Sequence, residues 1–449
     1  MKLNQSVSSA LKKLSKLLPN HIFLVGGFVR DTLCGYQSFD IDICGQDTPE
    51  VLFDSLKNSE FVAKTTSPKL MTLKIKHKDL EFEYTTFRKE SYTKGHSPSK
   101  VEPTDSILED AKRRDFKINA IYYDINDGAL VDPLDALADL GRRIISTVDE
   151  PKKVFSRDGL RLMRLARFAG QLGFDIEQKT LEAAKEYSHL IKDIAPQRIR
   201  EELDKILVAD TCHNVPNGHI KALRVLDEIG VLAIILPELT LGKGMIQRAD
   251  FHKHDVFEHT LQTVRFAPPQ IRLAALLHDI AKPYCFLKSG RYARHDIEGE
   301  RITKEVMTRL CYSNKQIARV SRLVRWHMYD LNNQAKLNTL RVFIQNNADI
   351  VPDLIELKMA DSKGSGVHDD KNLTAVRMQK VYNDMVKEQV PFAIKDLKIN
   401  GEDLLLLPQE KRGIMQRELL KQCAYFDSDL KTREKQLAFV AREINRYKK

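Results

Sequence analysis

The hydrophobic pattern of the chain changes its period near Val154. Before this point, short runs rich in β-branched and aromatic residues alternate with turns, as they do in sheets. After it, apolar residues recur every three to four positions, and proline and threonine stand where helices would begin. The sequence therefore predicts an α+β protein, with a mixed sheet in the first third and helices in the remaining two thirds.

The length of 449 residues is too great for one hydrophobic core, so several domains are expected. We expect domains at residues 1–150, 151–245, 246–390 and 391–449. Within the first of them, the Ser, Lys and Pro residues between Ser91 and Ser106 predict a mobile loop.

Composition narrows the partners and the compartment. A net charge of +10 favours a polyanionic partner such as a nucleic acid. The six cysteines are scattered without a C-x-x-C pair, which predicts reduced thiols instead of a disulfide framework. No apolar stretch approaches the length of a membrane span, and the N-terminal residues have the spacing of an amphipathic helix. A cytoplasmic protein without a membrane partner is expected.

Two aspartates one residue apart, Asp40 and Asp42, lie in the strand-like run FDIDI. Because side chains alternate along a strand, Phe39, Ile41 and Ile43 should face the core while both carboxylates point out of the sheet together. Such a pair stays ionised beside a cation, and Mg²⁺ with its oxygen ligands is the natural candidate. A lone D-x-D can also be a solvated strand edge.

Two glycines, Gly26 and Gly27, follow the preceding strand and open a helix-like run that contains Arg30. Backbone N–H groups at such a turn suit a phosphate. A phosphate site beside a two-carboxylate metal site is an arrangement that can transfer nucleotides. A third acid should come from a neighbouring strand, where Glu81 and Glu83 share one face.

Two longer motifs follow, EDAKRRDFKINAIYYD at 109–124 and LVDPLDALADLGRRII at 130–145. With G-G-x-V-R-D and D-x-D, they make the first half of the chain resemble the class II tRNA nucleotidyltransferases and bacterial poly(A) polymerases of the polymerase β superfamily. The resemblance implies a nucleotidyltransferase domain followed by helical neck, body and tail segments. It also implies addition of CMP and AMP, from CTP and ATP, to the tRNA 3′ end without a nucleic acid template.

The resemblance assigns roles to individual residues. It implies that Asp40, Asp42 and Glu83 are catalytic and hold Mg²⁺. It implies nucleotide contacts for seven residues of the first domain, namely Gly26, Gly27, Arg30, Arg113, Arg114, Asp115 and Asn119. Without the resemblance, the two adjacent arginines among them would be read as a solvated basic pair.

Nucleotide selection is expected from Asp158, Arg161 and Arg164, three residues apart in a helix that Ser156 would open, and so on one face. Carboxylate and guanidinium groups can hydrogen-bond the edges of cytosine and adenine. The row resembles the family template E-D-x-x-R, but Arg157 replaces its acid here and should repel the template arginine. CC-only, A-only or poly(A) addition therefore stays open, although the loop at 91–106 matches a family loop that favours full CCA addition. Packing of an Arg-rich helix on the sheet is the structural alternative.

The second half contains a histidine-rich pattern. An apolar helix precedes His278 and Asp279, with His259 upstream and Asp361 downstream, which resembles the H...HD...D pattern of HD phosphohydrolases. These ligands suit a divalent transition metal. Three further histidines are expected as auxiliaries, namely His254, His295 and His327.

Two outcomes remain open for this HD region. It removes cyclic or terminal phosphates from tRNA, or it is a helical RNA-contacting body with a vestigial metal site. The alternative function of another class is an HD phosphohydrolase whose N-terminal half only binds RNA.

Overall fold

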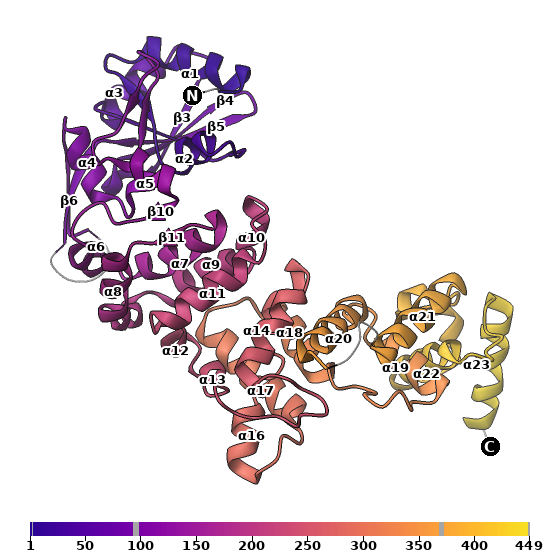
Figure 1. The fold of residues 1–449 in the computed structure, drawn as a ribbon. Coiled ribbons are helices and arrows are strands. Elements are labelled where there is room, and N and C mark those ends of the chain that lie inside the picture. The colour runs from indigo at the N-terminus through magenta and orange to yellow at the C-terminus, as the bar shows by residue number, and fades with distance from the viewer. Residues whose placement is uncertain (2, 93–97, 368–371, 448–449) are drawn as a thin grey trace. The chain divides into compact units, whose positions relative to one another are not determined.

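The computed structural model describes residues 1, 3–92, 98–367 and 372–447 (Figure 1). The chain forms two compact units, Met1–Pro237 and Glu238–Lys449. A mixed sheet lies in the first unit and helices build the second, which confirms the α+β class. The finer boundaries near residues 150, 245 and 390 stay predictions.

The core of the first unit is a seven-stranded sheet with the order β3-β4-β5-β2-β1-β8-β9. β2 and β5 run parallel, and the other neighbouring strands run antiparallel. The strands are β1 (Ile22–Leu24), β2 (Ile41–Gly45), β3 (Val62–Ser67), β4 (Thr72–His77), β5 (Leu80–Thr86), β8 (Tyr122–Asp124) and β9 (Leu130–Val131).

Short helices accompany this sheet: α1 (Gln5–Leu17), α2 (Gly27–Leu33), α3 (Pro49–Leu56), α4 (Ile107–Arg113) and α5 (Ala136–Arg142). α1 is the predicted amphipathic helix, and the Asn4 side chain caps it by accepting from the backbone N–H of Ser6. Leu11 and Leu14 of α1 are buried in the core that also contains Ile43 of β2. Their burial attaches the N-terminal helix to the sheet.

The segment between Ser91 and Ser106 differs from its prediction. Lys100–Pro103 forms a strand, β7, that pairs antiparallel with β6 (Arg88–Ser91). The backbone hydrogen bonds of this hairpin order part of a segment whose composition alone predicted a loop. Residues 93–97, inside the predicted loop, lie outside the described residues.

Helices complete the first unit: α6 (Pro151–Arg157), α7 (Leu160–Leu172), α8 (Gln178–Glu186), α9 (Pro196–Leu207), α10 (Ala209–Cys212), α11 (Gly218–Glu228) and α12 (Val231–Ile235). A two-stranded parallel pair, β10 (Ile144–Ile145) and β11 (Asp175–Ile176), accompanies them. α7 and α11 pack closely, since a Cβ at Gly170 would lie 2.4 Å from the carbonyl oxygen of Gly218.

α13 (Pro237–Thr240) crosses the boundary between the units. The second unit contains α14 (Val256–Phe266), α15 (Arg272–Leu277), α16 (Lys282–Ser289), α17 (His295–Arg309), α18 (Asn314–Trp326), α19 (Leu337–Asn346), α20 (Val351–Ser365), α21 (Leu373–Lys387), α22 (Gln409–Ala424) and α23 (Arg433–Tyr447). α14 and α20 are in close contact, because a Cβ at Gly364 would lie 2.5 Å from Thr263 Oγ1. This contact brings together the two helices that carry His259 and Asp361.

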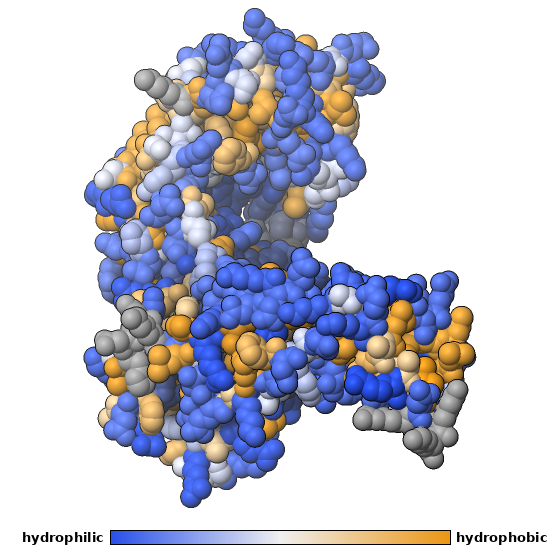
Figure 2. Space-filling model, turned by 90° about the vertical axis from the view of Figure 1, so that its right-hand side faces the viewer, coloured by the Kyte–Doolittle hydropathy of each residue, from blue (hydrophilic) through white to orange (hydrophobic). Residues whose placement is uncertain are grey.

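The face of the molecule in Figure 2 is mostly hydrophilic, with smaller apolar areas between the polar side chains. Among the described residues, none of the helices combines the length and the apolar character needed to cross a bilayer. All six cysteines are free thiols, as predicted.

Candidate active site and metal centre

The predicted carboxylates come from two neighbouring strands. Asp42 on β2 lies directly beside Glu83 on β5 in the parallel register, and Asp40 precedes β2. Phe39 was expected in the core but is 81% exposed. The strand begins only at Ile41, so the alternation of faces does not reach back to Phe39.

The charges of the three acids act on one another. Burial and the negative charges of Asp40 and Glu83 raise the pKa of Asp42 to about 6, against the opposing effect of Arg114. Glu81 instead forms an exposed ion pair with Lys74 at 2.5 Å. The register and the pKa of Asp42 therefore favour Glu83 as the third acid.

The acidic cluster fits a hard divalent cation electrostatically, because a cation would relieve the repulsion that raises the pKa of Asp42. Asp40, Asp42 and Glu83 are not among the described groups whose ligand atoms all lie within 4.8 Å of one another. The repulsion between the negative charges therefore favours a cation at this site, although the carboxylate oxygens are not close enough to form one of those groups.

Gly26 is required beside the acids. Its φ of 77° is in the left-handed region, and a Cβ there would lie 2.9 Å from Asp42 Oδ2. Gly26 is also the N-cap residue of α2, and Gly27 is the first residue of that helix. The glycine pair therefore brings bare backbone next to the Asp42 carboxylate, as the sequence predicted.

A buried polar chain connects four of the predicted nucleotide contacts. Arg30 donates to Asn119 Oδ1 at 2.6 Å, and Asn119 donates to Asp115 Oδ1 at 3.1 Å. The other oxygen of Asp115 accepts from Arg164 Nη2 at 2.6 Å. Although burial opposes it, Arg164 holds the pKa of Asp115 well below its usual range. The sequence correctly singled out residues that lie together, and their contact with a nucleotide stays a prediction.

Arg113 and Arg114 both bind the fully buried carboxylate of Asp110, at 2.7 and 3.0 Å. Tyr122 donates to the same carboxylate at 2.7 Å. Against the effect of burial, the two arginines lower the pKa of Asp110 to about 2. Neither arginine is a solvated cation, and Arg114 additionally acts on the charge of Asp42.

The predicted helical row of Asp158, Arg161 and Arg164 does not form. α6 ends at Arg157, and α7 begins at Leu160, so Asp158 lies between two helices. Ser156 is inside α6 and opens no helix. The break lies at Asp158, whose backbone is extended with φ −152° and ψ 109°, whereas Gly159 already has helical dihedral angles.

The side chains of this row point to separate partners. Arg161 donates to the backbone carbonyls of Val154 and Arg113, at 3.2 and 2.6 Å. Asp158 accepts from Arg198 at 2.8 Å. Arg157, which replaces the template acid, pairs with Asp149 at 3.3 Å. The selection of bases by Asp158, Arg161 and Arg164 stays a prediction, without the shared helix face.

The second unit brings together the four predicted HD ligands. His259 lies on α14, His278 and Asp279 follow α15, and Asp361 lies on α20. His259 Nε2 is 3.0 Å from Asp361 Oδ1 and 3.4 Å from Asp279 Oδ2. His278 Nε2 is 3.2 Å from Asp279 Oδ2 and 3.3 Å from His259 Nε2. These residues fit a divalent transition metal with mixed nitrogen and oxygen ligands.

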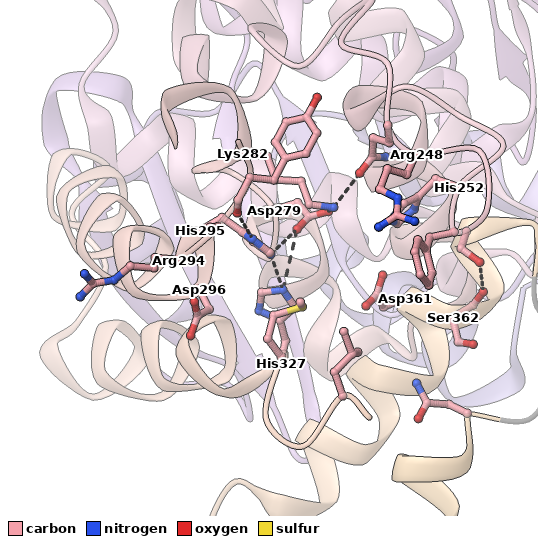
Figure 3. Close-up of a pocket in the computed structure, with 18 residues that line it drawn as sticks. Arg248, His252, Asp279, Lys282, Arg294, His295, Asp296, His327, Asp361 and Ser362 are labelled. Atoms are coloured by element: carbon pink, nitrogen blue, oxygen red, sulfur yellow. Dashed lines mark hydrogen bonds and ion pairs between the residues drawn. The ribbon is translucent and has the colours of Figure 1, made fainter. Parts of the chain in front are cut away.

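Two of the three predicted auxiliaries also lie at this centre. His295 and His327 approach Asp279 Oδ1 at 3.3 and 3.7 Å, and the three side chains point toward one another in Figure 3. His254 belongs to none of the described groups of close ligand atoms. His252 and His254 lie two residues apart in HKHD, and the sequence alone does not show which of them faces the site.

Sequence reasoning missed two residues at this centre. The His252 ring lies edge-on to the His259 ring, with centroids 4.5 Å apart. Lys282 Nζ is 2.6 Å from Asp279 Oδ2 and donates to Gln247 Oε1 at 2.7 Å. The spacing of Lys282 three residues after Asp279 on a helical turn was the signal that could have identified it.

Burial and neighbouring charges set the protonation of these histidines. Burial lowers the pKa of His278, but Asp279 and Asp361 together raise it to about 10. Burial and the adjacent His295 lower the pKa of His327 to about 3. His327 is therefore neutral at physiological pH, which is the form that binds metals, whereas His278 would release a proton when a metal binds.

Comparison with known proteins adds to this geometry. Three family profiles match the chain: "Poly A polymerase head domain" at residues 22–146, "Probable RNA and SrmB-binding site of polymerase A" at 173–241, and "HD domain" at 256–362. Among solved structures, the CCA-adding enzyme of Bacillus stearothermophilus in complex with CTP is similar in fold, with a TM-score of 0.67 and 21% identity, covering 99% of this chain and 100% of that one. The CCA-adding enzyme of Thermotoga maritima complexed with tRNA gives 0.61 and 19%, covering 98% and 96%.

Two curated relatives are more similar in sequence. A CCA-adding enzyme of Lactococcus lactis subsp. cremoris is 39% identical over 193 residues, which are 43% of this chain and 48% of the relative. An A-adding tRNA nucleotidyltransferase of Deinococcus radiodurans is 32% identical over 361 residues, which are 76% of each chain. With this identity over three quarters of both chains, the protein belongs to the tRNA nucleotidyltransferase family.

Proposed function

We propose that this chain adds CMP and AMP, from CTP and ATP, to the 3′ end of tRNA without a nucleic acid template. The observation that carries the proposal is the position of Asp42 beside Glu83 and Asp40, against the backbone of Gly26. The net charge of +10 agrees with a tRNA partner. Six free thiols favour a reducing compartment, and we place the reaction in the cytoplasm.

In the reaction, the 3′ hydroxyl of the tRNA attacks the α-phosphate of the nucleotide. The bond from the α-phosphorus to the bridging oxygen breaks, and pyrophosphate leaves. Asp40, Asp42 and Glu83 would hold Mg²⁺, which supplies positive charge for the phosphates and lowers the pKa of the hydroxyl. The backbone N–H groups at Gly26 and Gly27 donate hydrogen bonds to the triphosphate beside these acids.

Nucleotide selection is proposed for Asp158, Arg161 and Arg164. Arg161 is held by two backbone carbonyls and Arg164 by Asp115, so both guanidinium groups are fixed before a nucleotide arrives. Asp149 offsets part of the positive charge of Arg157, which still acts on Arg161. This pairing supports CCA addition despite the missing template acid.

The test uses purified protein and three tRNAs that end before the first, second or third nucleotide of CCA. Each nucleotide is supplied separately, and the products are sequenced. Addition of C, C and A in turn is expected. AMP on the third tRNA alone would replace the proposal with A-only addition, which the Deinococcus relative favours. A ladder of AMP on unrelated RNA would replace it with poly(A) synthesis.

A second candidate function belongs to the second unit. Its histidines and aspartates favour a divalent transition metal at His259, His278, Asp279 and Asp361, and hydrolysis of a terminal or cyclic phosphate on tRNA. The test supplies tRNA with a 3′-phosphate or a 2′,3′-cyclic phosphate and follows loss of that group. Asp279→Asn should abolish the loss, and no loss in the parent protein would refute this candidate.

A further inference from the structure

A buried carboxylate, Asp31, lies beside the proposed triphosphate site of the first unit. A Cβ at Gly27 would lie 3.5 Å from Arg30 Nη2 and 4.0 Å from Asp31 Oδ2, so a cation and an anion both border this bare backbone. The Asp31 side chain is only 8% exposed, and its negative charge would repel a phosphate at Gly27. Binding of a triphosphate here therefore requires that the charge of Asp31 is balanced.

Asp31 also fixes the Arg30 guanidinium group. Arg30 Nε donates to Asp31 Oδ1 at 2.8 Å, and Nη2 lies 2.6 Å from the same oxygen. Nη1 donates to Asn119 Oδ1 at 2.6 Å, and the ring of Phe168 on α7 lies 5.0 Å from the guanidinium carbon. Arg30 is thereby held in one orientation, but an arginine and a single carboxylate together carry no net charge that would attract a phosphate.

A second cation reaches Asp31 from His213, the residue that follows α10. His213 Nε2 lies 3.4 Å from Asp31 Oδ1, and the His213 side chain is only 2% exposed. Its ring stacks on that of Tyr36, with centroids 4.2 Å apart and an angle of 10° between the planes. The backbone N–H of Tyr36 donates to the carbonyl oxygen of Asp31 at 2.8 Å. The stack therefore holds the imidazole against Asp31, although the two residues are far apart in the sequence.

His213 carries a positive charge at physiological pH. Burial lowers the pKa of His213, but Asp31 and Cys212 raise it to about 9. Cys212 Sγ lies 3.6 Å from the same ring nitrogen that faces Asp31. His213 and Arg30 in turn lower the pKa of Asp31, against the effect of burial. Asp31 is therefore a carboxylate between two cations, and the three groups together keep one positive charge next to Gly27.

We propose that His213 is a positioning residue for nucleotidyl transfer, which balances Asp31 and so keeps the fixed Arg30 guanidinium positive toward the triphosphate. The inference rests on the proposed function, because it concerns the affinity of the same site for CTP and ATP. His213 lies in the helical part of the first unit, whereas the phosphate site is formed by α2 and the turn before it. The helical part thereby supports a site that it does not itself form.

The experiment measures KM and kcat for CTP with the full-length chain and a tRNA that ends before CCA. His213→Gln removes the charge and should raise KM about tenfold while kcat changes less than about twofold, because the triphosphate is anionic before and during the reaction. His213→Arg supplies a planar cation and should return KM to within about threefold of the parent value. Incorporation with an unchanged KM in His213→Gln would overturn the inference alone, whereas no incorporation by the parent would refute the proposed function and the inference with it.

The pH dependence separates a role of the charge from a purely structural role. KM of the parent should rise about fivefold between about pH 8 and 10, as His213 loses its proton, and this rise should be absent from His213→Arg. The matched control is His219→Gln in α11, another buried histidine, which pairs with Asp210 at 3.1 Å and should leave KM and its pH dependence unchanged. A parent KM that is constant over this range would overturn the proposal even where His213→Gln fails to fold.

Discussion

The carboxylate site of the first unit and the histidine site of the second each contain an aspartate removed from solvent, and they balance its negative charge differently. Asp40 is exposed. Burial and the neighbouring acids raise the pKa of Asp42, and the positive charges of Arg114 and Arg164 offset this only in part. In the histidine site, Asp279 is buried among imidazoles and Lys282, which hold its pKa well below its usual range against burial. We therefore expect the first site to exchange a hard cation readily and the second to retain a softer ion.

The two sites also differ in how the chain builds them. Asp42 and Glu83 meet through the register of two neighbouring strands. The histidine site collects side chains from α14, the end of α15, α17, the end of α18 and α20. A site made by adjacent strands depends on few contacts, whereas one made by five elements requires a folded helical body.

The largest expected effect is a loss of nucleotide incorporation that leaves the activity of the second unit unchanged. Asp42→Asn should lower nucleotide incorporation about a thousandfold, because it removes a ligand and a charge at the reacting phosphate. Release of phosphate by the second unit should be unchanged. Glu81→Gln is the matched control, since Glu81 lies on the same strand as Glu83 but pairs with Lys74 at the surface. Incorporation that survives Asp42→Asn and falls with Glu81→Gln would reverse the assignment.

Chelation should distinguish the sites by ion exchange. Brief exposure to EDTA should lower incorporation about a hundredfold, since oxygen ligands release Mg²⁺ readily, while ions bound by buried histidines stay. Added Mg²⁺ should restore incorporation. Activity is measured with labelled nucleotide, and retained metal by mass spectrometry. Loss of both ion types at the same rate would remove the contrast between the sites.

A smaller effect is expected at Gly26. Gly26→Ala places a Cβ 2.9 Å from Asp42 Oδ2 at a φ of 77°. It should lower incorporation about tenfold and destabilise the first unit by about 1 to 2 kcal/mol. The control is Gly413→Ala in α22, where no atom lies within 4 Å of the added Cβ. This control should gain about 0.5 to 1 kcal/mol. Equal behaviour of the two variants would contradict the role of Gly26.

The smallest effect concerns stability and pH. The folded pKa of Asp42 is raised from 3.8 to about 6, so the parent loses stability as pH rises through this window. Without divalent ions, Asp42→Asn should therefore be more stable than the parent above pH 6, by about 1 to 2 kcal/mol after allowance for solvent screening. The gain should vanish below about pH 4. Thermal unfolding at several pH values measures it, and a gain independent of pH would exclude the titration of Asp42 as its cause.

The sequence predicted most of the sheet and the acids, because these depend on local patterns. The runs around Asp42 and Glu83 have the period of strands, and both strands form. Phe39 was predicted in the core but is exposed, since hydrophobic alternation does not specify at which residue strand pairing begins. The break at Asp158 was missed because helices lie directly before and after this single extended residue.

The structure gives several charged residues partners that the sequence did not predict. Arg113 and Arg114 both bind Asp110, three and four residues earlier in the chain, and their contact with a triphosphate stays a prediction. Spacings of three and four residues allow such pairs, but the burial of Asp110 that makes them strong is a tertiary property. For the same reason, His252 and His254 could not be separated before the fold was known.

The parallel pairing of β2 and β5 carries a consequence for how the protein becomes active. A slip of one residue would place Phe82 beside Asp42 and turn Glu83 to the opposite face of the sheet. With the proposed roles of Asp42 and Glu83, nucleotide addition would require correct pairing of these strands, and a chain with this slip would add no nucleotides.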